Sequence, residues 1–291
     1  MRLAASLFAL PPEKEVLVKK LVLGFAATAS LCAFARFAAE PECLHGGKVT
    51  DWWFGRFATL REEARKTGKD VKIAFVGDSI TENWHVPGLK VPGDATWERF
   101  FATPRHRAIN LGFGGDRTEH VLWRLRNGQM DGLDPEVVVL QIGTNNLGEN
   151  GDAEPAGDTI YGIRACVRTI LAKCPRAKVV LHPIPPRGER PGTAVRRQLD
   201  VVNLELPRMA DGRRVFWCDY SKRLLTADGV LTKEIAADGV HLTAKGHQIW
   251  AEALLPLIDA LLGHADGLPD GTVPNGAVDY RPDVPRMSGW I

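Results

Sequence analysis

The strongest constraint on the fold is a repeated alternation of short apolar runs with stretches of helical periodicity. Short apolar runs of this kind are typical of strands that are buried on both faces of a sheet. The five runs are VKIAFV (71–76), RAINLGFGG (107–115), EVVVLQIGTNN (136–146), AKVVLHPIPP (177–186) and RVFWCDY (214–220). The helical stretches are residues 51–66, 117–128, 158–173, 193–210 and 244–262.

Strands that alternate with helices predict a parallel sheet covered by helices on both faces. We therefore expect one α/β domain over residues 51–263, with three layers and a doubly wound, five-stranded sheet. No internal repeat or low-complexity segment interrupts this order. Residues 264–291 are rich in Pro and Gly, and we expect them to form a C-terminal tail outside the domain.

The N-terminal segment has the order of a secretory signal: basic residues, an apolar stretch, then small residues. Lys19 and Lys20 precede the apolar residues 21–35, which end in the small-x-small sequence Ala33-Phe34-Ala35. We predict a signal peptide at residues 1–35, a linker at residues 36–50, and a secreted or periplasmic mature protein without stable membrane association. An uncleaved anchor stays open, although the apolar stretch is shorter than the roughly 20 residues that span a bilayer.

Charge and cysteine content narrow the functional classes. Cleavage after Ala35 removes four basic and two acidic residues from a chain of formal charge +2, which leaves a net charge of zero. A neutral chain without a basic run does not predict nucleic-acid binding. Four cysteines remain, and we interpret them as buried free thiols, because Cys166 and Cys174 lie too far apart on one predicted helix to form a disulfide. The other two are Cys43 and Cys218.

Small and polar residues follow three of the predicted strands where each one ends. They are Gly77-Asp78-Ser79, residues 112–116 and residues 143–146, and a fourth such stretch at residues 238–241 precedes the last helix. Ligands of an open parallel sheet bind at the carboxyl ends of its strands. We therefore expect these stretches to meet in one site.

The residue types in these stretches suit acyl transfer. A serine hydroxyl is a nucleophile only when a base removes its proton, and His241 can do this for Ser79. Asp238 can orient the imidazole and stabilise its charged form. The backbone N–H groups of Ser79 and Gly115 and the side-chain amide of Asn145 are the candidate donors to a developing oxyanion.

These residues resemble the four sequence blocks of the GDSL, or SGNH, serine hydrolases, in the expected order. The stretches FVGDSI, NLGFGGDRTEHVLWRLRNG, VVVLQIGTNN and PRGERP are most similar to the branch that contains the catalytic subunits of platelet-activating factor acetylhydrolase. The resemblance covers about residues 71–262 and implies a flavodoxin-like sheet, a Ser-His-Asp triad and no cofactor. The subunits of that branch form dimers, so the resemblance leaves a homodimer open.

We predict that the protein is a secreted serine esterase that hydrolyses short-chain acyl esters, acetyl above all, on carbohydrates. Hydrolysis of a phospholipid acetyl ester is the first alternative, and a non-catalytic carbohydrate-binding module on the same fold is the second. Trp84, His85 and Asn146 are candidate pocket residues. No group of residues has the spacing of a metal site, so we predict no metal. The expected partner is a small acyl ester or acetylated carbohydrate.

Overall fold

The computed structural model describes residues 50–148 and 154–264. The five strands of these ranges are β1 (Ile73–Gly77), β2 (Ala108–Gly112), β3 (Val137–Gln141), β4 (Lys178–Leu181) and β5 (Val215–Trp217). They form one sheet in the order β2-β1-β3-β4-β5, and every neighbouring pair is parallel. The expected doubly wound, five-stranded parallel sheet is confirmed.

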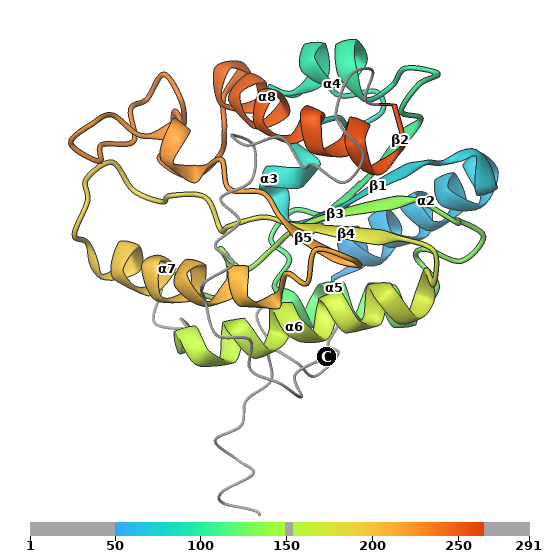
Figure 1. Ribbon diagram of the computed structural model, residues 1–291, viewed down its shortest axis with the longest axis horizontal. Coiled ribbons are helices and arrows are strands. Elements are labelled where there is room, and N and C mark those ends of the chain that lie inside the picture. Colours follow the sequence, from blue (N-terminus) through green and yellow to red (C-terminus); the bar gives the residue numbers. More distant parts are fainter. Residues whose placement is uncertain (1–49, 149–153, 265–291) are drawn as a thin grey trace, which may run out of the picture. The chain divides into compact units, whose positions relative to one another are not determined.

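Helices cover both faces of this sheet (Figure 1). One layer contains α2 (Asp51–Thr67), α5 (Thr118–Arg126), α6 (Ala156–Lys173) and α7 (Ala194–Glu205). The other contains α3 (Ser79–Glu82), α4 (Asp94–Phe100) and α8 (Ala244–Leu261). Three short 3-10 turns complete the described elements: η1 (Gly68–Asp70), η2 (Leu206–Met209) and η3 (Ser221–Leu224).

The side chains of each strand alternate between the two helical layers. In β1, Ala74 and Val76 pack in the core with α2, α5, α6 and α7, whereas Ile73 and Phe75 pack in the core with α4 and α8. All four side chains are buried, because successive residues of a strand point to opposite faces and both faces are covered. This double burial explains why the strands are continuous apolar runs.

Two helices of the structure were not predicted from the sequence. Both α3 and α4 lie in the segment between β1 and β2, whose mixed polarity gives no clear helical period. Trp97 of α4 is buried against Phe75 of β1, with ring centroids 5.2 Å apart. This segment therefore contributes part of the hydrophobic core.

The cysteine prediction is confirmed for the described residues: Cys166, Cys174 and Cys218 are free and buried. Burial raises the pKa of the Cys218 thiol to about 12, so it stays protonated and unreactive at neutral pH. The signal peptide, the linker, Cys43 and nearly all of the C-terminal tail lie outside the described residues. Within the described ranges, no helix is both long enough and apolar enough to span a bilayer.

Candidate active site

Ser79 is presented by a tight turn where β1 ends and α3 begins. Oδ1 of Asp78 accepts a hydrogen bond from the backbone N–H of Ile80 at 2.9 Å, so Asp78 caps α3 and Ser79 is its first residue. A Cβ atom on Gly77 would lie 2.1 Å from Oγ1 of Thr81 and 2.3 Å from the carbonyl oxygen of Gln141. Only glycine fits there, which explains the Gly-Asp-Ser sequence at the end of the strand.

His241 and Asp238 come from the loop that precedes α8. Oδ1 of Asp238 accepts hydrogen bonds from the N–H groups of Val240 (2.9 Å) and His241 (2.8 Å), and its Oδ2 lies 2.6 Å from Nδ1 of His241. Gly239 has a φ of 76° in this turn, a value that favours glycine. The N–H of Gly188 also donates to the carbonyl of Gly239 at 2.8 Å and holds the loop against the chain after β4.

The three side chains form one hydrogen-bonded chain, because Nε2 of His241 lies 2.8 Å from Oγ of Ser79. Burial by itself would raise the pKa of Asp238, but the hydrogen bonds from His241 and Val240 outweigh it and lower this pKa to about 2. The carboxylate is therefore ionised near neutral pH and can only accept a hydrogen bond, which the Nδ1–H group of His241 donates. This assignment leaves Nε2 of His241 free to accept the hydroxyl proton of Ser79.

Two of the expected oxyanion donors lie in neighbouring loops, Gly115 after β2 and Asn145 after β3. Gly115 is exposed and has a φ of 74°, so its backbone N–H is not shielded by a side chain. The Nδ2 group of Asn145, which follows β3, donates to the carbonyl of Asp116 at 2.8 Å. This bond occupies one of the two N–H donors of Asn145 and ties the loop after β3 to the loop after β2.

A buried ion pair supports the loop after β2, and sequence analysis did not predict it. Nε of Arg124 lies 2.6 Å from Oδ2 of Asp116, and both side chains are fully buried. Arg124 also donates to the carbonyls of Leu111 (3.1 Å) and Gly77 (3.3 Å). Trp53 donates from Nε1 to Oδ1 of Asp116 at 2.8 Å. The guanidinium of Arg124 therefore links the ends of β1 and β2 to Asp116, the residue that follows Gly115.

Two of the three expected pocket residues cannot line an open pocket. Trp84 is fully buried and packs on Trp250 with ring centroids 4.9 Å apart. Asn146 is also fully buried, and its side chain bonds to Thr118, Glu119 and Glu154. Both expectations are corrected, because tertiary packing encloses these side chains.

His85 is the one pocket candidate with an accessible side chain, at 30% relative exposure. Its Nδ1 lies 3.1 Å from Oδ1 of Asp94, and its ring stacks on Trp97 with centroids 5.9 Å apart. These contacts hold the imidazole in place. A role for His85 in substrate binding stays a prediction.

The comparisons with known proteins agree with this architecture. A parallel α/β sheet with a serine, a histidine and an aspartate joined by hydrogen bonds at its carboxyl edge is the arrangement of serine ester hydrolases. Residues 75–249 match the GDSL-like Lipase/Acylhydrolase family. The chain therefore belongs to that family and is a carboxylic ester hydrolase.

Among curated relatives, platelet-activating factor acetylhydrolase IB subunit alpha1 of Homo sapiens is 31% identical over 215 residues, which are 73% of this chain and 87% of that protein. The alpha2 subunit of Rattus norvegicus is 34% identical over 228 residues, 77% of this chain and 91% of that protein. The resemblance to this branch of the family is thereby confirmed.

Solved structures share the fold at lower identity. A GDSL-like lipase from Bacteroides thetaiotaomicron has a TM-score of 0.56 at 23% identity and covers 71% of this chain and 97% of its own. The acetylxylan esterase Axe2 from Geobacillus stearothermophilus has a TM-score of 0.52 at 18% identity and covers 66% of this chain and 96% of its own.

Proposed function

We propose that this protein is a serine esterase that removes short acyl groups, acetyl above all, from carbohydrates. Ser79 is the nucleophile, His241 the general base and Asp238 the residue that orients it. The observation that carries this proposal is the unbroken hydrogen-bonded chain from Asp238 through His241 to Ser79. The backbone N–H groups of Ser79 and Gly115 and the amide of Asn145 are the proposed oxyanion donors.

In the proposed reaction, Oγ of Ser79 attacks the acyl carbon while Nε2 of His241 takes the hydroxyl proton. The oxyanion donors stabilise the tetrahedral intermediate. When it collapses, the alcohol leaves with the proton from His241 and the acyl group remains on Ser79. A water molecule, deprotonated by His241, then attacks the acyl-enzyme in the same way and releases the carboxylic acid.

The accessibility of the site supports a large polar substrate. The side chains of Asp238 and His241 are 56% and 39% exposed, respectively. An acyl group on a polymer can therefore approach this edge of the protein from solvent. The relatives named as acetylhydrolases favour acetyl as the acyl group, and the expected export with a net charge of zero favours extracellular glycans.

The same relatives keep phospholipid acetyl esters as the second candidate substrate class. The two classes are separated by measuring acetate release from an O-acetylated glycan and from a phospholipid that carries an acetyl ester. We expect release from the glycan, and kcat/KM for nitrophenyl acetate well above that for nitrophenyl octanoate. Acetate from the phospholipid alone would make lipid the substrate. Glycan binding without release from any ester would instead indicate a carbohydrate-binding module.

We also propose that the protein is exported and cleaved near residue 35, a proposal that rests on the order of basic, apolar and small residues in its N-terminal segment. Mass spectrometry of the exported protein tests this directly. The mature chain is expected to begin near Arg36. An exported chain that retains residues 21–35 would contradict cleavage.

A further inference from the structure

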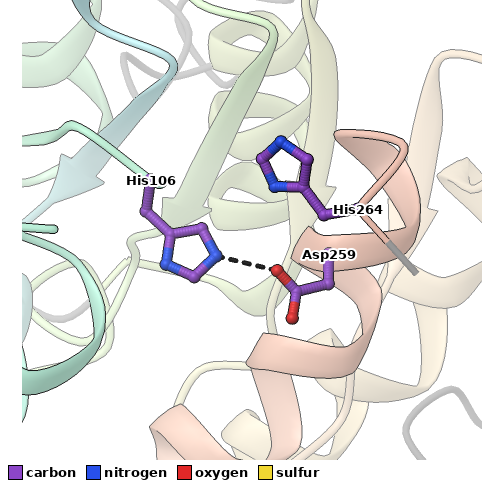
Figure 2. Close-up of side chains that lie close together, drawn as sticks. All are labelled: His106, Asp259 and His264. Atoms are coloured by element: carbon purple, nitrogen blue, oxygen red, sulfur yellow. Dashed lines mark hydrogen bonds and ion pairs between the residues drawn. The ribbon is translucent and has the colours of Figure 1, made fainter. Parts of the chain in front are cut away.

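Three side chains from two distant segments of the chain form a cluster outside the candidate active site. His106 lies in the loop between α4 and β2, Asp259 in the last turn of α8, and His264 just after that helix. One ligand atom of each residue lies within 4.8 Å of the other two. Figure 2 shows the His264 ring beside the His106–Asp259 pair, with one ring nitrogen turned toward it.

The contacts of His106 orient its ring as in a metal ligand. Nδ1 of His106 hydrogen-bonds the carbonyl oxygen of Phe100, and a carbonyl can only accept, so Nδ1 carries a proton. Nε2 then faces Oδ1 of Asp259 at 2.8 Å. A neutral ring would point a lone pair at a carboxylate, which is stable only if a proton or a cation lies between them. Metal-ligating histidines commonly donate their other N–H to a backbone carbonyl in this way.

His264 supplies a second imidazole at the same place. Its Nδ1 is buried and has no hydrogen-bond partner among residues 50–148 and 154–264. A buried polar atom without a partner carries a desolvation cost that a bound ion would remove. Arg105 donates to the carbonyl of His264 at 2.8 Å and to Oδ1 of Asp259 at 3.1 Å. Arg105 therefore fixes the backbone at His264. It also shares Oδ1 of Asp259 with His106.

We propose that His106, Asp259 and His264 bind a divalent transition-metal ion, with Zn²⁺ as the best match. Two imidazole nitrogens and one carboxylate oxygen suit Zn²⁺, Co²⁺, Ni²⁺ or Cu²⁺, whereas Ca²⁺ and Mg²⁺ prefer sets made of oxygen alone. Three protein ligands leave the fourth tetrahedral position to water. The three ligand atoms lie within 4.8 Å of one another, and an ion held at about 2.0–2.2 Å from each would draw them closer together.

The position of the cluster assigns it a structural role. His106 precedes β2, which begins at Ala108, so the cluster lies at the amino edge of the sheet. Ser79 follows β1, at the opposite edge. A bound ion would fasten the end of α8 to the loop before β2 and take no part in ester hydrolysis. The expectation of no metal site came from sequence spacing, which cannot detect ligands more than 150 residues apart.

The test uses the full chain without an affinity tag, stripped with EDTA and titrated with Co²⁺, whose visible absorption reports low-coordinate sites. We expect one Co²⁺ per chain, displacement by Zn²⁺, and a higher Tm with Zn²⁺ than in EDTA. His264→Ala is expected to weaken binding at least ~10-fold, since even outer-shell changes cost 10–100-fold. Asp259→Asn keeps the shape of the side chain and is expected to weaken binding similarly.

Two control variants separate this site from other histidines. His85→Ala removes another His–Asp pair (His85 with Asp94), and His241→Ala removes the exposed imidazole of the candidate triad. Both are expected to keep the Co²⁺ spectrum and the affinity. No Co²⁺ binding by the wild-type chain would overturn the proposal, and so would His264→Ala and Asp259→Asn variants that bind Co²⁺ as tightly as the wild type. Loss of the spectrum in His241→Ala alone would place the ion at the triad and also overturn it.

Discussion

Nε2 of His241 lies 2.8 Å from Oγ of Ser79, although 162 residues separate the two in the chain. Ser79 is placed by the end of β1 and by the cap on α3, whereas His241 is placed by a surface loop. Asp238 holds that loop through three hydrogen bonds to Val240 and His241. The geometry of the pair therefore depends on one carboxylate, and this dependence leads to the first prediction.

Asp238→Asn is expected to lower kcat by about 10⁴, because an amide can donate to Nδ1 and so favour the wrong tautomer of His241. Steady-state kinetics with nitrophenyl acetate measure this. The pKa of Asp238, about 2, lies below its ordinary value of 3.8. Its contribution to stability is thus complete above pH 4 and lost as the pH falls toward 2. A kcat of Asp238→Asn equal to that of the wild type would contradict this role of Asp238.

Asn145→Ala is expected to lower kcat by roughly 10²–10³ with little change in KM, the range for losing one oxyanion donor. The comparison variant is Asn127→Ala, which removes an exposed amide that also donates to a backbone carbonyl, that of Trp123. It is expected to keep wild-type kinetics. A large rise in KM at constant kcat would make Asn145 a substrate-binding residue instead.

Arg124→Met is expected to lower the free energy of unfolding by about 3–5 kcal/mol, because it removes the cation that pairs with the buried carboxylate of Asp116. Urea unfolding of the variant measures this loss. The double variant Asp116→Asn/Arg124→Met removes both charges and is expected to recover part of the stability. Arg126→Ala, at an exposed position of the same helix, is the control. Equal stability of Arg124→Met and Arg126→Ala would show that the buried pair does not stabilise the fold.

Asp78 provides a test of pH dependence. Burial raises the pKa of Asp78 from 3.8 to about 7, against the hydrogen bond from the N–H of Ile80. Between these values the folded protein binds more protons than the unfolded chain, so Asp78 makes the free energy of unfolding decrease as the pH rises from 4 to 7. Asn can still accept from the N–H of Ile80 without a charge.

Asp78→Asn is therefore expected to stabilise the protein at pH 8, by at most about 4 kcal/mol for a shift of this size, and to have little effect at pH 4. Urea unfolding at both pH values checks the difference. A variant that is destabilised equally at pH 4 and pH 8 would show that ionisation of Asp78 does not destabilise the folded protein.

The sequence predicts most strongly what depends on local order. The alternation of buried strands and helices predicts the sheet. The polar stretches at three strand ends and before the last helix predict that Ser79 and His241 meet. Residues that depend on tertiary packing are harder to predict. Trp84 looks like a pocket residue because it follows Ser79, yet it packs into the core on α8.

Partners far apart in the chain are hidden for a related reason. Arg124 donates a hydrogen bond to the carbonyl of Gly77, 47 residues away. Its ion-pair partner Asp116 is only eight residues away, but the bond to Gly77 forms only after β1 and β2 have paired. The pairing of His106 with Asp259 spans 153 residues. No local periodicity reports such contacts, because they form only when separate helices and loops pack around the sheet.

The most direct test of the central claim is labelling with a fluorophosphonate probe, which reacts with a serine activated by a base. We expect one label per chain, located on Ser79 by peptide mass spectrometry, and no label in a folded Ser79→Ala variant. Ser221→Ala is the matched control, because Oγ of Ser221 bonds Oδ1 of Asp219 at 2.6 Å, and it is expected to label fully. Labelling that persists in Ser79→Ala would contradict the assignment of Ser79 as the nucleophile.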